Sequence, residues 1–159
     1  MTSPLSLSRV ARLLRRRPRP PAEVLDPYAA AALPLLERAE LLYHQWFEYV
    51  ALVADSEKLA NAAAIQRWEA ATLARSLEQV VPPEVLAGAH ADLVITLHQA
   101  SRASQLLSSG SRYHNANALC EGQVLLTAAR ERRLKAFRAV RRILGDPRPG
   151  DQRPADGLR

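Results

Sequence analysis

The sequence has few of the residues and patterns on which common protein chemistries depend. Its single cysteine, Cys120, excludes an intramolecular disulfide framework and is compatible with a reducing compartment. No apolar run approaches the roughly 20 residues that a membrane-spanning helix needs. Arginines interrupt the apolar residues of positions 1–20, so this stretch does not match a secretory signal. These absences predict a cytoplasmic protein, with peripheral contact to a membrane left open.

Catalytic and cofactor motifs are also missing. The chain contains no G-x-S-x-G elbow, no Walker loop, no G-x-G-x-x-G loop and no Glu-x-x-His repeat of the kind that diiron bundles use. A missing motif does not exclude an enzyme, but it removes the reason to propose one. The sequence therefore predicts no catalytic residue, no metal ligand, no cofactor and no small-molecule substrate.

Two of the four histidines follow a proline pair on one predicted helix. His90 and His98 are eight positions apart, which places them about 80° apart around the helix and roughly 12 Å apart along it. They cannot bind one ion together, because two ligands on one helix need a spacing of three or four. We expect His90 to hydrogen-bond to a neighbouring helix.

Other potential ligands are equally scattered. Glu40, His44 and Glu48 are separated by steps of four, which is typical of a solvated ladder of side chains along one helix face. His114 and Cys120 are six positions apart and face different sides of a helix. Cys120 is followed by an acidic residue and not by a basic one that would favour a thiolate, so we expect a buried structural cysteine rather than a reactive one.

The fold class is predicted as all-α. Sustained alternation is absent, and the residues that favour helix dominate. Proline and glycine positions divide the chain into three helical segments, 34–80, 83–109 and 111–144, with Pro83 in a first turn and Gly145 as a C-cap. Short connections make successive helices antiparallel, which gives a three- or four-helix bundle.

Each segment carries an apolar seam with spacings of three and four. The seams are rich in alanine and glycine, so helix axes can approach closely and the bundle is expected to be solid rather than hollow. The seams comprise Leu59, Ala63, Gln66, Ala70, Leu73, Leu77 and Val80; Leu86, Ala89, Leu93, Leu97, Ala100, Ala103 and Leu107; and Ala118, Gly122, Leu125, Ala129, Ala136, Val140 and Ile143.

The first segment is too long for its partners. A continuous helix over 34–80 would span roughly 70 Å, against about 40 and 50 Å for the other two. The lack of proline or glycine after Pro34 favours this continuous helix, whose uncovered apolar half would form a protein interface. The predicted interface residues are Leu42, Tyr43, Trp46, Phe47, Val50 and Val53. The alternative is a turn at A-D-S-E, capped by Asp55 or Ser56, which gives four helices.

The distribution of charge divides the chain into two basic ends and an acidic middle. Residues 1–20 carry six arginines and no acid, residues 21–129 carry six basic and twelve acidic side chains, and residues 130–159 carry ten basic and four acidic ones. Prolines predict an extended linker over 18–27, so an arm and linker (1–27) precede the bundle (28–144) and a disordered, basic tail (145–159).

The basic arm predicts an amphipathic helix that contacts a polyanion or a membrane surface. Its basic residues are Arg9, Arg12, Arg15, Arg16, Arg17 and Arg19. The favoured function is a non-enzymatic helical assembly protein that binds a protein partner or itself around Trp46, with the arm as a tether. The alternatives are a nucleic-acid accessory protein that uses the arginine-rich ends and a metal-dependent enzyme around His90, Glu40 and His44.

Overall fold

The computed structural model describes the backbone of residues 21–52 and 56–145, and the side chains of residues 21–46 and 56–145. Within these ranges the chain forms four α-helices and no strand. The helices are α2 (Ala22–Leu52), α3 (Ser56–Glu78), α4 (Glu84–Arg112) and α5 (Ala116–Leu144). The predicted all-α antiparallel bundle is confirmed in its four-helix form.

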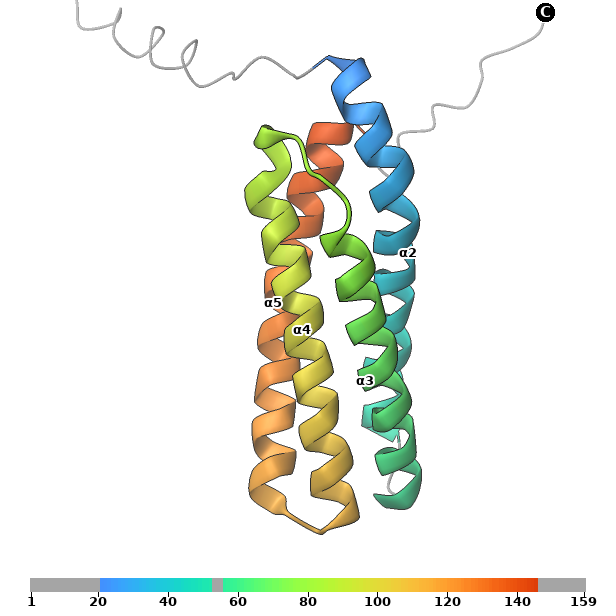
Figure 1. The fold of residues 1–159 in the computed structure, drawn as a ribbon. Helices are drawn as coiled ribbons and strands as arrows, with labels where there is room; N and C mark the ends of the chain where they lie inside the picture. Colours follow the sequence, from blue (N-terminus) through green and yellow to red (C-terminus); the bar gives the residue numbers. More distant parts are fainter. Residues whose placement is uncertain (1–20, 53–55, 146–159) are drawn as a thin grey trace, which may run out of the picture.

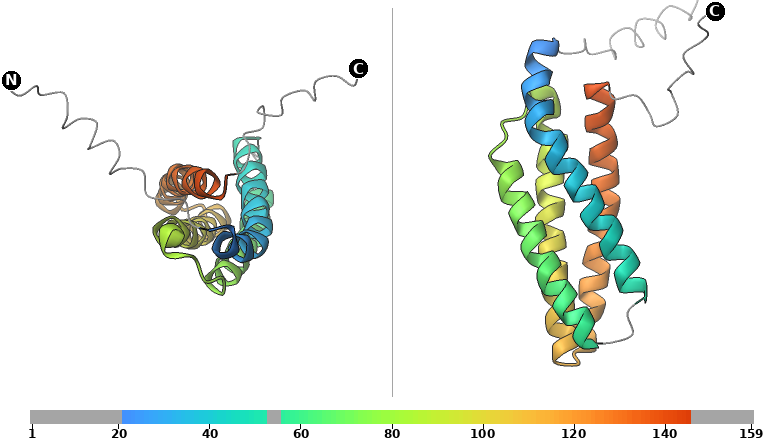
Figure 2. Two further views of the ribbon diagram at one scale, coloured as in Figure 1. Left: turned by 90° about the horizontal axis from the view of Figure 1, so that it is seen from above. Right: turned by 90° about the vertical axis from the view of Figure 1, so that its right-hand side faces the viewer.

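Successive helices run in opposite directions around a common core (Figure 1). Seen from above, α2, α3, α4 and α5 follow one another around the bundle, and α5 returns to lie beside α2 (Figure 2). Helices α3 and α5 therefore lie diagonally across the core from each other. Residues 21 and 145 lie at the same end of the bundle.

The continuous helix predicted over 34–80 is wrong. α2 ends at Leu52, α3 begins at Ser56, and the two helices pack against each other as an antiparallel pair. The physical reason is burial: each large apolar side chain removed from water contributes about 1.5–3 kcal/mol. A straight helix would leave the apolar face of α2 in solvent. Folding back covers that face, which outweighs the lack of a proline or glycine at the turn.

The bundle also begins earlier than predicted. α2 starts at Ala22, so residues 22–27 are helical rather than part of an extended linker, and both Pro27 and Pro34 lie inside the helix. An internal proline removes one backbone hydrogen bond and crowds the preceding turn. Both prolines are exposed, and the carbonyl groups four residues before them belong to exposed residues. Water can therefore satisfy the carbonyls that lose their partners.

α4 continues three residues past the predicted range 83–109. Gly110 sits against Leu119 so closely that a Cβ there would lie 2.9 Å from Leu119 Cγ. The turn comes instead at His114, which adopts a left-handed conformation with φ of 51°. The amide of Asn115 donates to the Gly110 carbonyl over 2.8 Å, as in a Schellman motif. Gly110 is therefore needed for helix packing, and the chain reverses without a glycine.

The ends of α5 are capped by side chain and backbone. Asn115 accepts a hydrogen bond from the amide of Ala118, which satisfies a donor of the first turn. Gly145 has φ of 75° and donates its amide to the Arg141 carbonyl. Its predicted role as a C-cap is confirmed.

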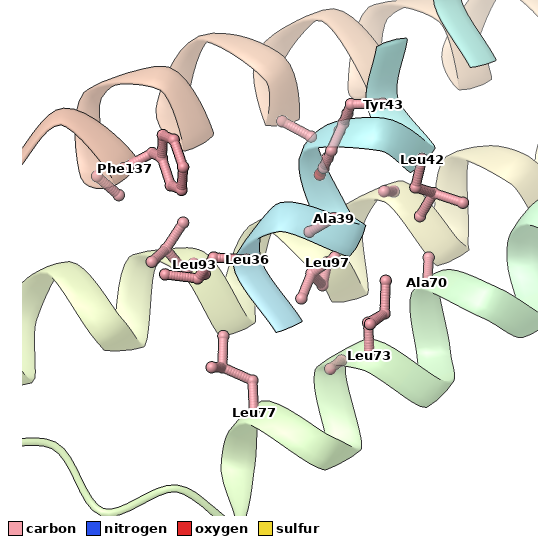
Figure 3. Packing of buried hydrophobic residues seen from close by; sticks show 14 of the residues in the cluster. Leu36, Ala39, Leu42, Tyr43, Ala70, Leu73, Leu77, Leu93, Leu97 and Phe137 are labelled. Atoms are coloured by element: carbon pink, nitrogen blue, oxygen red, sulfur yellow. The ribbon is translucent and has the colours of Figure 1, made fainter. Parts of the chain in front are cut away.

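The core follows the predicted seams of α3, α4 and α5. Small residues bring these helices together: a Cβ on Gly122 would lie 2.9 Å from Leu107 Cγ. α2 instead inserts large side chains such as Leu36, Leu42 and Tyr43, so its axis stays further from its neighbours (Figure 3). The buried seam residues are Ala63, Ala70, Leu73 and Leu77 in α3, Leu86, Leu93, Leu97, Ala100, Ala103 and Leu107 in α4, and Gly122, Ala129, Ala136 and Val140 in α5.

Two glycine variants test the close approach of α4 and α5. Gly122→Ala places a methyl group against Leu107 and the Ala103 carbonyl, so we expect a net loss of about 1–2 kcal/mol in the free energy of unfolding. Gly88→Ala adds its methyl group where nothing lies within 4 Å, and we expect a gain of about 0.5–1 kcal/mol from helix propensity. Urea denaturation measures both changes, and an equal gain in both variants would contradict the packing.

Candidate functional site

The predicted protein interface lies mostly inside the bundle. Leu42, Tyr43 and Trp46 are 6%, 2% and 2% exposed, so the expectation that they form an uncovered surface is wrong. α3 folds back along α2, and together with α4 and α5 it covers Leu42 and Tyr43 (Figure 3). Trp46 belongs to the same buried cluster. The backbones of Phe47 and Val50 belong to α2, but their side chains lie outside the described residues, and so does the whole of Val53.

The exposed apolar surface is found on α3 instead. Ile65 and Trp68 are 62% and 63% exposed and lie one turn apart. Residues spaced by three or four on either side share their face, and together they form what we call the α3 stripe. The α3 stripe consists of Glu57, Asn61, Ile65, Trp68, Thr72 and Arg75.

The sequence contained a signal for this surface. The buried seam of α3 includes Ala63, Ala70 and Leu77, and at 100° per residue Trp68 lies about half a turn from that seam. An aromatic residue opposite a core seam must face solvent or a partner. The protein interface was predicted around Trp46 because apolar residues are denser there than around Trp68. That density instead indicates a helix face that the chain itself covers.

His90 connects three helices, as the sequence led us to expect of a buried histidine. Its Nδ1 lies 3.1 Å from the hydroxyl of Tyr28 on α2, and the ring also hydrogen-bonds to the backbone of Leu77 on α3. Burial lowers the pKa of the imidazole, and the hydrogen bond to the Leu77 backbone offsets part of this by raising it. Burial also raises the pKa of the Tyr28 hydroxyl, to about 12.

A second buried polar group joins α2 to α4 and α5. The Tyr43 hydroxyl donates to the Thr96 carbonyl over 2.8 Å. The guanidinium of Arg133 lies 4.6 Å from the centre of the Tyr43 ring and donates to the carboxylate of Glu40. Only 8% of the Arg133 side chain is exposed, against 36% for Glu40. Burial lowers the pKa of Arg133, while the adjacent carboxylate favours its charged form.

A groove of about 390 Å³ opens beside this pair, between α2 and α5. It forms where the larger side chains of α2 hold the two helices apart. Its walls carry two cations, an acid, a histidine, an aromatic ring and a leucine. The lining residues are Glu40, Leu41, Tyr43, His44, Arg130 and Arg133. Arg133 is buried because its spacing from Ala129 and Ala136 puts it in the core seam of α5.

The remaining histidines are separated from one another. His98 projects outward, away from His90, and its Nε2 lies 2.7 Å from a carboxylate oxygen of Glu78. His44 lines the α2–α5 groove together with Glu40. Tyr28 binds His90 twelve residues before Glu40, about 18 Å along α2, so the three residues suggested for a metal-dependent enzyme are not brought together.

Cys120 is exposed, so its predicted burial is wrong. Its position follows from its spacing, because it precedes the buried Gly122 by two residues and so points away from the seam. His114 occupies the turn between α4 and α5, where it is also exposed. Across residues 21–46 and 56–145, no three His, Cys, Asp or Glu side chains gather as a metal site would require.

The described residues include only part of the arginine-rich regions of the chain. The six arginines of the predicted polyanion-binding arm all lie outside the described residues, so their role stays a prediction. On α5, Arg132 lies 3.9 Å from Asp92, Arg133 pairs with Glu40, and Arg141 lies over the ring of Phe137. These arginines therefore point in several directions and do not form one basic face.

The pH dependence of stability should reflect His90. Burial holds its pKa below the ordinary value of 6.5, so the unfolded chain binds this proton first as the pH falls. The stabilisation is complete above pH 6.5 and decreases below it. We expect the free energy of unfolding to fall between pH 7 and 5, and to fall less in His90→Gln. Chemical denaturation at each pH measures both slopes, and identical slopes would contradict this assignment.

Comparison with known protein families, with curated proteins and with solved structures gives no match to this chain. In the described segments, every helix is too short or too polar to cross a membrane. The function must therefore be inferred from the surfaces of the bundle.

Proposed function

We propose that this chain is a non-enzymatic helical assembly protein that binds a second copy of itself through the α3 stripe. The supporting observation is the exposure of Ile65 and Trp68, more than 60% each, side by side on one helix. Tryptophan is among the residues most enriched where protein interfaces gain their energy. A tryptophan that remains in solvent while the chain buries its other one is poorly explained by folding alone.

The stripe has the symmetry that self-association requires. A two-fold interface brings the same surface of each copy together, so each half of the stripe must complement the other. Glu57 lies eight residues before Ile65, and Arg75 lies seven residues after Trp68. An axis midway between Ile65 and Trp68 therefore sets Glu57 of one copy within one residue, about 1.5 Å along the helix, of the position opposite Arg75 of the other.

The same pairing joins the apolar centres. With α3 antiparallel to its symmetry mate, Ile65 of one copy faces Trp68 of the other, and the contact is made twice. The flanking Asn61 is polar and exposed, which matches the polar rim around an apolar centre that interfaces show. Ala64 beside the stripe is small and exposed, so the helices can approach closely.

The N-terminal arm keeps its proposed role as a tether for this assembly. Its six arginines against a net acidic segment 21–129 favour contact with an anionic partner rather than with another copy's arm. The proposed interface is centred on Trp68 of the α3 stripe and not on Trp46.

Truncating the centre of the stripe should dissociate the assembly. Trp68→Ala removes an exposed side chain that becomes buried in the dimer, at a cost of about 2 kcal/mol or more, which raises Kd at least about 30-fold. Sedimentation equilibrium over a range of concentrations measures the change. The thermal stability of the monomer should hardly change, because Trp68 contributes little to the core.

Val124→Ala is the matched control, because Val124 is 65% exposed on α5 and lies outside the stripe. It should leave Kd within about twofold of wild type, as expected for an exposed position that no partner covers. A wild-type chain that stays monomeric up to millimolar concentration would overturn the proposal, and so would equal effects of the two substitutions.

Charge reversal tests the antiparallel register. Glu57→Arg sets two arginines against each other across the axis, and Arg75→Glu sets two glutamates against each other. Each single variant should weaken self-association about fivefold, as expected for two exposed ion pairs of about 0.5 kcal/mol each. The double variant Glu57→Arg with Arg75→Glu restores opposite charges, so its Kd should return towards wild type. Additive weakening in the double variant would exclude this register.

A further inference from the structure

We propose that a pocket between α3 and α4 binds the phosphate monoester group of a small molecule. The pocket has a volume of about 240 Å³ and lies in the half of the bundle that contains the turn between α4 and α5 (Figure 1). Two arginines, a glutamine, two serines, a tyrosine and an alanine line it. It borders the α3 stripe at Ala64 but shares no residue with it, so the proposal does not rest on self-association.

The two arginines come from different helices, and neither is neutralised by a carboxylate. Arg67 belongs to α3 and Arg112 to the last turn of α4, and both side chains are exposed. In the part of the chain that the structure describes, no acidic side chain pairs with either guanidinium, in contrast to Arg133, which pairs with Glu40. Two like charges that face one pocket without an acid repel each other. An anion in the pocket would relieve this repulsion.

The rest of the lining adds hydrogen-bond donors and no acid. The Oε1 atom of Gln105 accepts a hydrogen bond from the guanidinium of Arg102 over 3.1 Å, so the other end of the amide, Nε2, is the end that donates. The hydroxyl of Tyr113 is a further donor. Guanidinium groups bind phosphate through paired, charge-assisted hydrogen bonds. Two guanidinium groups together with an amide and a phenol therefore suit an oxyanion.

Hydrogen bonds between α3 and α4 fix the two walls of the pocket. Ser108 donates from its Oγ to the Ala60 carbonyl over 2.9 Å. Ser101 donates to the carbonyl of Arg67 itself over 3.1 Å. Both bonds join α4 to α3, so the backbone that carries the arginines is in place before a ligand arrives. Preorganisation of this kind lowers the cost of binding.

The carbonyl groups at the C-terminal end of α4 are partly satisfied. A helix C-terminus carries roughly half a negative charge, which disfavours a bound anion. Here the amide of Tyr113 donates to the Ser109 carbonyl over 3.0 Å, and the amide of Asn115 donates to the Gly110 carbonyl over 2.8 Å. The two guanidinium charges exceed what remains, so the pocket is positive although it lies beside a helix C-terminus.

Charge and size favour a small dianion. The two positive charges of the lining balance a phosphate monoester, which carries a charge of about −1.5 to −2 at pH 7. A carboxylate would balance only one of them. A long polyanion is disfavoured, because residues 21–129 carry twelve acidic against six basic side chains. The volume is below the usual range for drug-sized ligands, which favours a phosphate on a body of few atoms.

Glycerol 3-phosphate is the probe for this pocket, because it carries a phosphate monoester on a short polar body. Titration into isotope-labelled protein at low salt should give saturable shifts of the amide resonances of residues 64–67 and 105–113, with a Kd on the order of 1 mM for a ligand of about ten non-hydrogen atoms. Methanesulfonate, which has a tetrahedral head with a single charge, should bind at least about fivefold more weakly, and uncharged glycerol should give no saturable shift.

Arg67→Gln and Arg112→Gln are the informative variants, because both side chains are exposed and their loss spares the core. Each should weaken binding of glycerol 3-phosphate about fivefold to tenfold. Arg138→Gln is the matched control. It removes the same charge from an exposed position of α5 outside the pocket, so it should change Kd less than about twofold.

Equal losses of binding in Arg67→Gln and Arg138→Gln would indicate a general effect of charge and would overturn the proposal. Methanesulfonate binding as tightly as glycerol 3-phosphate, or no saturable shift up to about 20 mM, would do the same. A single-stranded oligonucleotide that binds at least about tenfold more tightly than glycerol 3-phosphate, and loses binding in the same two variants, would assign the pocket to a nucleic-acid backbone instead.

Discussion

The position of α2 depends on the contacts that one side chain, Tyr43, makes with α4 and α5. Its hydroxyl is bound by a carbonyl of α4, its ring supports an arginine of α5, and only 2% of it is exposed. Three helices are thus tied together by a residue too large for the close spacing that alanine and glycine permit among α3, α4 and α5. The groove beside it follows directly, because α2 must stand off by the width of its own aromatic and leucine side chains.

The parts of the fold that could be predicted are those decided by neighbours along the chain. Alternating spacings of three and four placed Ala63, Leu97 and Val140 correctly in the core, and Gly145 could be recognised as a cap because few other residues adopt a positive φ. The reversal between α2 and α3 could not be predicted in this way. Nothing local forces it, and its stabilisation comes from the packing of α2 against α3 and from contacts with α4 and α5, which begin only at Glu84 and Ala116.

The same distinction between local and long-range information applies to the functional surfaces. An apolar cluster such as that around Trp46 indicates burial but does not say whether the chain or a partner provides the cover. Trp68 could have been identified as exposed from its angle to the α3 seam alone. Arg133 is the reverse case. Its spacing predicts a core position, whereas its charge predicts a surface position. The structure shows it buried, with its guanidinium paired with the carboxylate of Glu40.

Residues 21 and 145 emerge at one pole of the bundle. In a two-fold assembly joined through antiparallel α3 helices, the second copy is inverted, so its corresponding pole points the opposite way. The two exits would be separated by about the length of a 29-residue helix, roughly 40 Å. Such a particle is bipolar. Anything attached to those ends would be presented in opposite directions, which suits a spacer between two surfaces better than a clamp on one.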